Sequence, residues 1–61
     1  MGNKILDAVF IFNNTTGMTE LRVPADYIEQ RNDWVLAFWD DRVVGGVKEE
    51  SLKAFYLTPS T

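Results

Sequence analysis

Acidic pairs are the residues of this chain that come closest, by type and spacing, to catalytic chemistry. They are Asp40 with Asp41, Glu49 with Glu50, and Asp26 with Glu29. Two carboxylates with different pKa values can share the roles of acid and base. The 61-residue chain contains no histidine and no cysteine, however, so the commonest general base and the strongest nucleophile are absent. Each pair is explained more simply as a turn, a polar loop or charge at a helix start, and we predict that the protein is not an enzyme.

The same composition predicts no metal site. Zinc and related metals bind mainly through histidine and cysteine side chains. Asp40 and Asp41 lack the alternating oxygen ligands and the glycine of a calcium-binding loop. We therefore expect neither a bound metal nor another cofactor.

Four further residues have the chemistry to hold a small anionic ligand. The guanidinium groups of Arg22 and Arg42 suit a phosphate or carboxylate, and the rings of Trp34 and Tyr56 suit stacking. A lone subunit of this size cannot enclose a pocket of about 300 Å³, so such a site would form between subunits. This predicts an alternative function, an oligomer that binds a nucleotide-like anion at its interfaces.

The charge of the chain bears on nucleic-acid binding. Nine acidic and six basic residues give a net charge of −3, and the basic residues are scattered rather than clustered. Small barrels do bind single strands on aromatic surfaces, but beside a basic groove. Binding of single-stranded nucleic acid is therefore the less favoured alternative.

Alternating and aromatic-rich segments predict five strands, at residues 4–12, 18–23, 34–39, 42–47 and 52–58. Turn residues separate the first pair at residues 13–17 and the fourth pair at Asp40 and Asp41. Residues 24–31 open with proline and have acids early and arginine late, which predicts a helix of one or two turns. Residues 48–56 also have good helix propensity, so a helix is the alternative to the last strand.

This order predicts one mainly β domain over residues 1–61. Five short antiparallel strands favour a small SH3-like or OB-like barrel, or a strongly bent sheet, with the helical turn between strands two and three. Gly45 and Gly46 indicate a bulge or a sharp bend in the fourth strand.

The segment at residues 34–39, WVLAFW, is apolar on both faces of the strand that it predicts. We expect Trp34, Leu36 and Phe38 to form the inner core. Aromatic residues of the opposite strand faces then form an exposed patch: Phe10, Phe12, Trp39 and Phe55. Such patches usually mark interfaces; in a monomer, the helical turn and the tail would have to cover this one.

Size supports the interface interpretation. A chain this short buries only about 60% of its unfolded surface, and without disulfides or metals the remaining common source of stability is oligomerisation. The sequence thus predicts a non-enzymatic, regulatory binding protein that contacts copies of itself and another protein. No membrane-spanning run and no signal-peptide pattern are evident, so we expect a cytoplasmic location.

Overall fold

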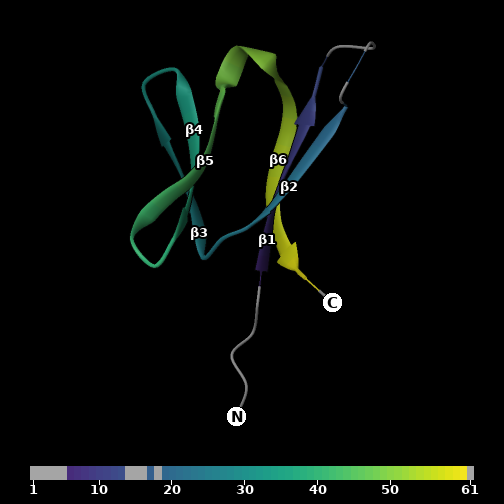
Figure 1. Cartoon of the computed structure of the whole chain (residues 1–61). Coiled ribbons are helices and arrows are strands. Elements are labelled where there is room, and N and C mark those ends of the chain that lie inside the picture. The colour runs from purple at the N-terminus through teal and green to yellow at the C-terminus, as the bar shows by residue number, and fades with distance from the viewer. Residues whose placement is uncertain (1–5, 14–16, 18, 61) are drawn as a thin grey trace.

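The computed structural model describes residues 6–13, 17 and 19–60. Within them the chain forms six strands and one 3-10 turn (Figure 1). The elements are β1 (Leu6–Phe12), β2 (Glu20–Pro24), β3 (Tyr27–Arg31), β4 (Trp34–Trp39), β5 (Arg42–Lys48), η1 (Glu49–Ser51) and β6 (Leu52–Pro59). The mainly β prediction is confirmed. Lys4, Met18 and most of the expected turn at residues 13–17 lie outside the described residues.

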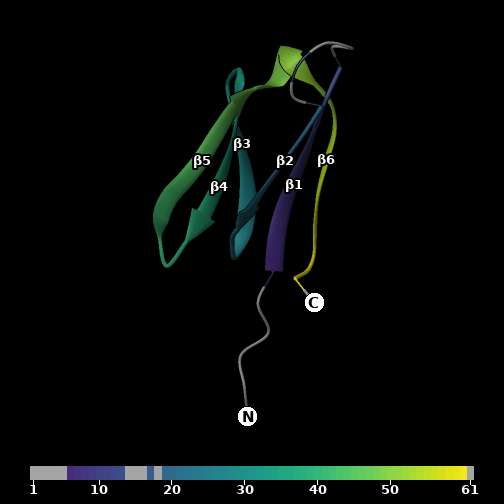
Figure 2. The same cartoon turned by 45° about the vertical axis from the view of Figure 1, so that its right-hand side comes forward.

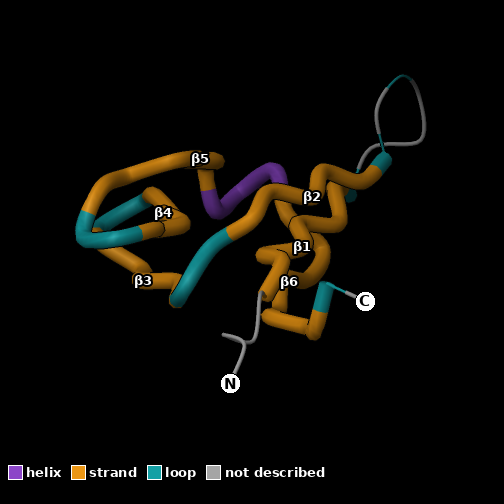
Figure 3. The backbone as a smooth tube through the Cα atoms, turned by 60° about the horizontal axis from the view of Figure 1, so that its bottom comes forward, coloured by secondary structure: helices purple, strands orange, loops and turns teal. Residues whose placement is uncertain are grey.

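The strands form two antiparallel three-stranded sheets. Sheet A has the order β2-β1-β6 and sheet B the order β3-β4-β5. Figures 2 and 3 show the two sheets as separate groups, joined by the β2–β3 link and by η1. The edges β2 and β5 approach each other, as do β3 and β6, but no strand pairing among the described residues closes the sheets into a barrel.

The predicted helix at residues 24–31 is wrong, because the structure has β3 there. The pairing with β4 runs from Tyr27, opposite Phe38, to Arg31, opposite Trp34. Ile28 packs against the core from this strand. Long-range pairing and burial therefore override the local helix propensity, which is a weak determinant in so short a segment.

The last strand follows the sequence prediction more closely. β6 covers Leu52–Pro59 and pairs with β1. The only helical segment among the described residues is η1, which lies after β5 and not between strands two and three. Pro24 ends β2 at a sheet edge, where its missing amide hydrogen costs no ladder bond.

The core lies between the sheets and is built around Phe10, which is fully buried. Small residues surround it: Ala8, Ala25, Val35 and Ala37. The prediction that Trp34, Leu36 and Phe38 form the inner core is wrong for Trp34 and Leu36, because the opposite face of β4 points toward Phe10. Phe38 is buried, with 7% exposure, but it lies beneath Tyr27 on the other face of the strand. A bulky phenylalanine from sheet A fills the space between the sheets, so sheet B presents small side chains to it.

The β4–β5 hairpin has the predicted turn. Asp40 and Asp41 adopt φ values of 55° and 63°, the left-handed conformation that tight hairpins need and that aspartate tolerates. The expected irregularity in β5 is also present. Ala37 pairs with Gly45 and the next residue, Phe38, pairs with Val43, which leaves Val44 as the extra residue of a bulge.

Candidate interaction surfaces

The outer face of sheet A carries ion pairs between its own side chains. The Arg22 guanidinium lies 2.8 Å from a Glu20 carboxylate oxygen and 3.8 Å from one of Asp7. The hydrogen bond to Glu20 is the main reason that the pKa of Arg22 is raised. Val9, between Arg22 and Tyr56 in the strand register, is fully buried on this face. Arg22 therefore already has two carboxylate partners, which weakens its prediction as an anion-binding group.

The other predicted ligand contacts are not brought together. Tyr56 lies on sheet A, whereas Trp34 and Arg42 lie on sheet B. Within sheet B, Trp34 pairs with Lys48 at one end of β4, and Arg42 pairs with Trp39 at the other end. The geometry gives no common site for Arg22, Arg42, Trp34 and Tyr56 within one chain.

The four predicted interface residues have different environments. Phe10 is fully buried, so its prediction as an exposed contact is wrong, and Phe12 is partly buried. Trp39 and Phe55 are exposed by 38% and 37%. Both lie on the inward-facing sides of their strands: Trp39 alternates with Val35 and Ala37, and Phe55 pairs with Phe10.

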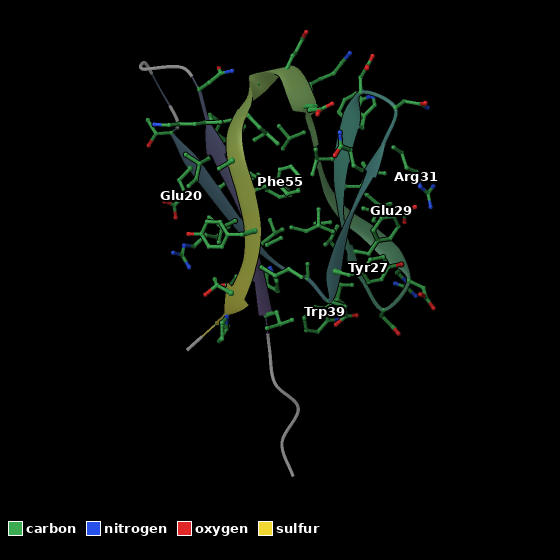
Figure 4. All side chains as sticks on the ribbon, turned by 180° about the vertical axis from the view of Figure 1, so that it is seen from behind. Glu20, Tyr27, Glu29, Arg31, Trp39 and Phe55 are labelled. Atoms are coloured by element: carbon green, nitrogen blue, oxygen red, sulfur yellow. The ribbon has the colours of Figure 1, made fainter. Side chains whose placement is uncertain are left out.

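Leu57, which was not among the predicted interface residues, belongs to the same group. It pairs with Ala8 on the inner face of sheet A and is exposed by 37%. We call Trp39, Phe55 and Leu57 the open side. Figure 4 shows Phe55 on β6 and Trp39 near the lower end of β4. These residues belong to core-facing surfaces, yet a single chain leaves more than a third of each exposed.

The outer face of sheet B is a second apolar surface. Its side chains are Tyr27, Glu29, Arg31, Trp34, Leu36, Phe38, Val43 and Lys48. Tyr27 stacks on Phe38, with ring centroids 4.9 Å apart and planes 4° from parallel. The Arg31 guanidinium carbon lies 5.6 Å from the Phe38 ring centroid. Both faces of β4 are thus apolar, but for different reasons. The inner face packs in the core, and the outer face contributes to this aromatic layer.

The Glu29–Arg31 pair is part of the same face and labelled in Figure 4. Arg31 donates to both Glu29 carboxylate oxygens, at 2.8 and 3.2 Å. The hydrogen bond from Arg31 lowers the pKa of Glu29, and the pKa of Arg31 is raised in return. Tyr27 and Arg31 were not predicted as site residues, because their segment was assigned to a helix. The segment YIEQR shows no apolar–polar alternation, and the strand follows only from its pairing with β4.

Trp34 lies at an acidic end of this face. The Lys48 ammonium lies 5.4 Å from the centroid of the Trp34 ring. A half-open pocket of about 380 Å³ is lined by Asp33, Lys48, Glu49 and Glu50. Backbone hydrogen bonds fix this end: Glu49 donates to the Asp33 carbonyl at 2.8 Å, and Asn13 donates to the Ser51 carbonyl at 3.0 Å.

Asp26 and Glu29 have different partners in the structure. Asp26 accepts a hydrogen bond from the Asp40 amide, whereas Glu29 pairs with Arg31. Among residues 6–13, 17 and 19–60, no three acidic side chains are grouped closely enough to hold a metal ion. No helix in that part of the chain is long and apolar enough to cross a membrane.

Comparison with known proteins adds no assignment. No protein-family model, no curated protein and no solved structure matches the chain. Any function must therefore be inferred from the two apolar surfaces, the open side and the outer face of sheet B.

Proposed function

We propose that this chain is a non-enzymatic, regulatory binding protein that acts through protein–protein contacts as a homo-oligomer. The observation that carries the proposal is the open side. Trp39, Phe55 and Leu57 face inward in the sheet pattern but remain 37–38% exposed. Exposed core-facing side chains signal an incomplete core, and a second copy with the same exposed set can complete it.

The chain path supports this interpretation. The chain begins with the β1–β2 hairpin and turns a corner at Pro24 to Asp26. It continues with the three-stranded meander β3–β4–β5 and a 3-10 turn before the last strand. We infer an SH3-like path that stays open in the single chain. Edges β3 and β6 flank the opening without pairing to each other. Association there would cover apolar surface and protect unpaired edges.

The proposed location is the cytoplasm. The chain contains no cysteine, and cytosolic proteins rarely rely on disulfides for stability. Self-association then supplies the stability that a 61-residue core lacks. The neutralised Arg22 makes a small anion at the interfaces the weaker alternative.

Neighbouring residues on β6 provide a matched test. Phe55 and Tyr56 are exposed by 37% and 44% but point to opposite faces of sheet A. We expect native mass spectrometry and sedimentation to show a discrete oligomer for the unmodified chain and for Tyr56→Ala. Phe55→Ala should dissociate it while circular dichroism shows a retained β-structure.

Trp39→Ala and Trp34→Ala form a second matched pair on β4. Trp39 belongs to the open side and Trp34 to the outer face of sheet B. Only Trp39→Ala should weaken the oligomer. A monomer at every concentration up to the millimolar range contradicts the proposal, and an oligomer lost only in Trp34→Ala moves self-association to the other surface.

A further inference from the structure

We propose that the outer face of sheet B binds an extended, positively charged peptide segment of a partner protein. This surface is distinct from the open side and goes beyond the proposed self-association. Trp34 is exposed by 43% and Tyr27 by 40%. The outer face of sheet A, in contrast, carries the Asp7–Arg22–Glu20 ion pairs beside the exposed Tyr56. The two sheets therefore differ in what they offer a partner.

The spacing of the apolar side chains fits an extended segment. Trp34, Leu36 and Phe38 occupy alternate positions of the central strand β4, so they repeat about every 6.8 Å along it. An extended peptide presents its own alternate side chains with the same repeat. Phe38 itself is buried beneath the stacked Tyr27 ring, so apolar residues at every second position of the partner would meet Trp34, Leu36 and the Tyr27 ring.

A glycine keeps the row accessible. Gly46 lies beside Leu36 on the neighbouring strand, and a Cβ atom there would lie 2.9 Å from Leu36 Cδ2 and 3.8 Å from Trp34 Cε3. The absent side chain leaves Leu36 free to lie over β5. The result is a broad apolar surface rather than a narrow ridge.

Charge complementarity identifies the partner as basic. Both ends of β4 are acidic, and the two ends together carry five carboxylates and two cations. They are Asp33, Glu49, Glu50 and Lys48 at the Trp34 end, and Asp40, Asp41 and Arg42 at the other end.

These two ends account for the whole net charge of −3, because the remaining four acidic and four basic residues of the chain balance. Arg31 also lies at the Trp34 end, but its charge is matched by that of Glu29. A second copy would bring like charges together, and a nucleic acid would meet the same repulsion. A segment with lysine or arginine at its ends has the matching charge.

The aromatic rings of this face already contact cations from the chain itself. Lys48 lies over Trp34 and Arg31 over Phe38. Cation–π attraction of this kind also suits a lysine or arginine of a partner. A cation of the partner would have to displace the ammonium of Lys48 from the Trp34 ring. Lys48 therefore competes with the partner's cation for this ring.

The probe for this proposal is the peptide acetyl-Lys-Leu-Lys-Leu-Lys-amide, followed by intrinsic fluorescence and by amide chemical shifts. The chain contains two tryptophans, so a Trp39→Ala variant reports on Trp34 alone. Acetyl-Glu-Leu-Glu-Leu-Glu-amide and an eight-residue oligothymidylate are the comparison ligands. We expect the lysine peptide to bind the unmodified and Trp39→Ala chains equally, with shifts along β4 on the outer face.

Substitutions test each contribution. Trp34→Ala should weaken the lysine peptide roughly tenfold, as for an aromatic anchor of an interface. Glu49→Gln with Glu50→Gln should weaken it about two- to fivefold, and Lys48→Gln should strengthen it by a similar factor, as expected for exposed charges. A nucleic acid would respond to Lys48→Gln in the opposite direction.

The outcomes separate this proposal from self-association. The proposal is supported if Trp34→Ala loses peptide binding while a dissociated Phe55→Ala variant keeps it. The partner site would then not require the oligomer. The proposal is overturned if neither peptide binds, if both bind equally, if oligothymidylate binds better, or if Trp34→Ala dissociates an oligomer formed through this face. Loss of the oligomer in Phe55→Ala bears on the proposed function alone.

Discussion

The carboxylate of Asp26 accepts a hydrogen bond of 2.8 Å from the backbone amide of Asp40. This contact joins the corner between β2 and β3 to the β4–β5 turn. The Asp26 amide also donates to the Phe38 carbonyl, so side chain and backbone together hold the left-handed turn against sheet B. The position of the acidic end formed by Asp40 and Asp41 therefore depends on a residue 14 positions earlier in the chain.

Asp26→Ala removes the acceptor for the Asp40 amide and should lower the free energy of unfolding by about 1 kcal/mol, the usual net value of one hydrogen bond. Asp26→Asn keeps a carbonyl oxygen at the same position and should cost less. Urea unfolding of both variants measures the difference. An Asp26→Ala variant as stable as the unmodified chain would show that the side-chain contact contributes nothing.

Phe10 and Phe55 lie opposite each other on β1 and β6 but differ in burial. Phe10→Leu should lower the free energy of unfolding by about 1–2 kcal/mol, because Phe10 is enclosed on all sides. Phe55→Leu should cost clearly less, since Phe55 is already 37% exposed. Unfolding must be followed well below the concentration of self-association. A larger loss for Phe55→Leu in that range would contradict the placement of the core.

Strand existence was predictable from sequence, but the inward face of β4 was not. β-branched and aromatic runs, and the Asp40–Asp41 turn, identified five of the strands. WVLAFW is apolar on both faces, so alternation alone does not tell which side meets Phe10. The missed strand at Tyr27–Arg31 depends on pairing with β4, a long-range contact that local propensity does not encode. The open side was found in part, because Trp39 and Phe55 are conspicuous aromatics and Leu57 is not.

The adjacent glycines of β5 should respond differently to the same substitution. A Cβ at Gly45 would lie 3.6 Å from Val23 Cγ2, an ordinary contact, whereas one at Gly46 would lie 2.9 Å from Leu36 Cδ2. Gly45→Ala should raise the free energy of unfolding by about 0.4–1 kcal/mol, because alanine restricts the unfolded chain. Gly46→Ala should be less stable than Gly45→Ala, since Leu36 must move. Thermal unfolding of the two variants side by side measures which one is more stable. The order of stabilities would be reversed if Gly45 faced outward.

The Glu29–Arg31 pair predicts a pH dependence with a defined sign. Because the hydrogen bond from Arg31 lowers the pKa of Glu29, the folded chain binds fewer protons at this group than the unfolded chain does. The contribution to stability is therefore present above the ordinary glutamate pKa and is lost as the pH falls through the lowered value. The pair is exposed, so the effect on stability is small, and the titration itself is the better readout.

Carboxyl chemical shifts of Glu29 should give a titration midpoint below that of an unperturbed glutamate. Arg31→Gln should raise this midpoint towards the ordinary range, because the charged donor is gone. A Glu29 midpoint that does not change in Arg31→Gln would mean that the two side chains are not paired in solution, and Glu29 would then add an uncompensated negative charge to the face proposed for the basic peptide.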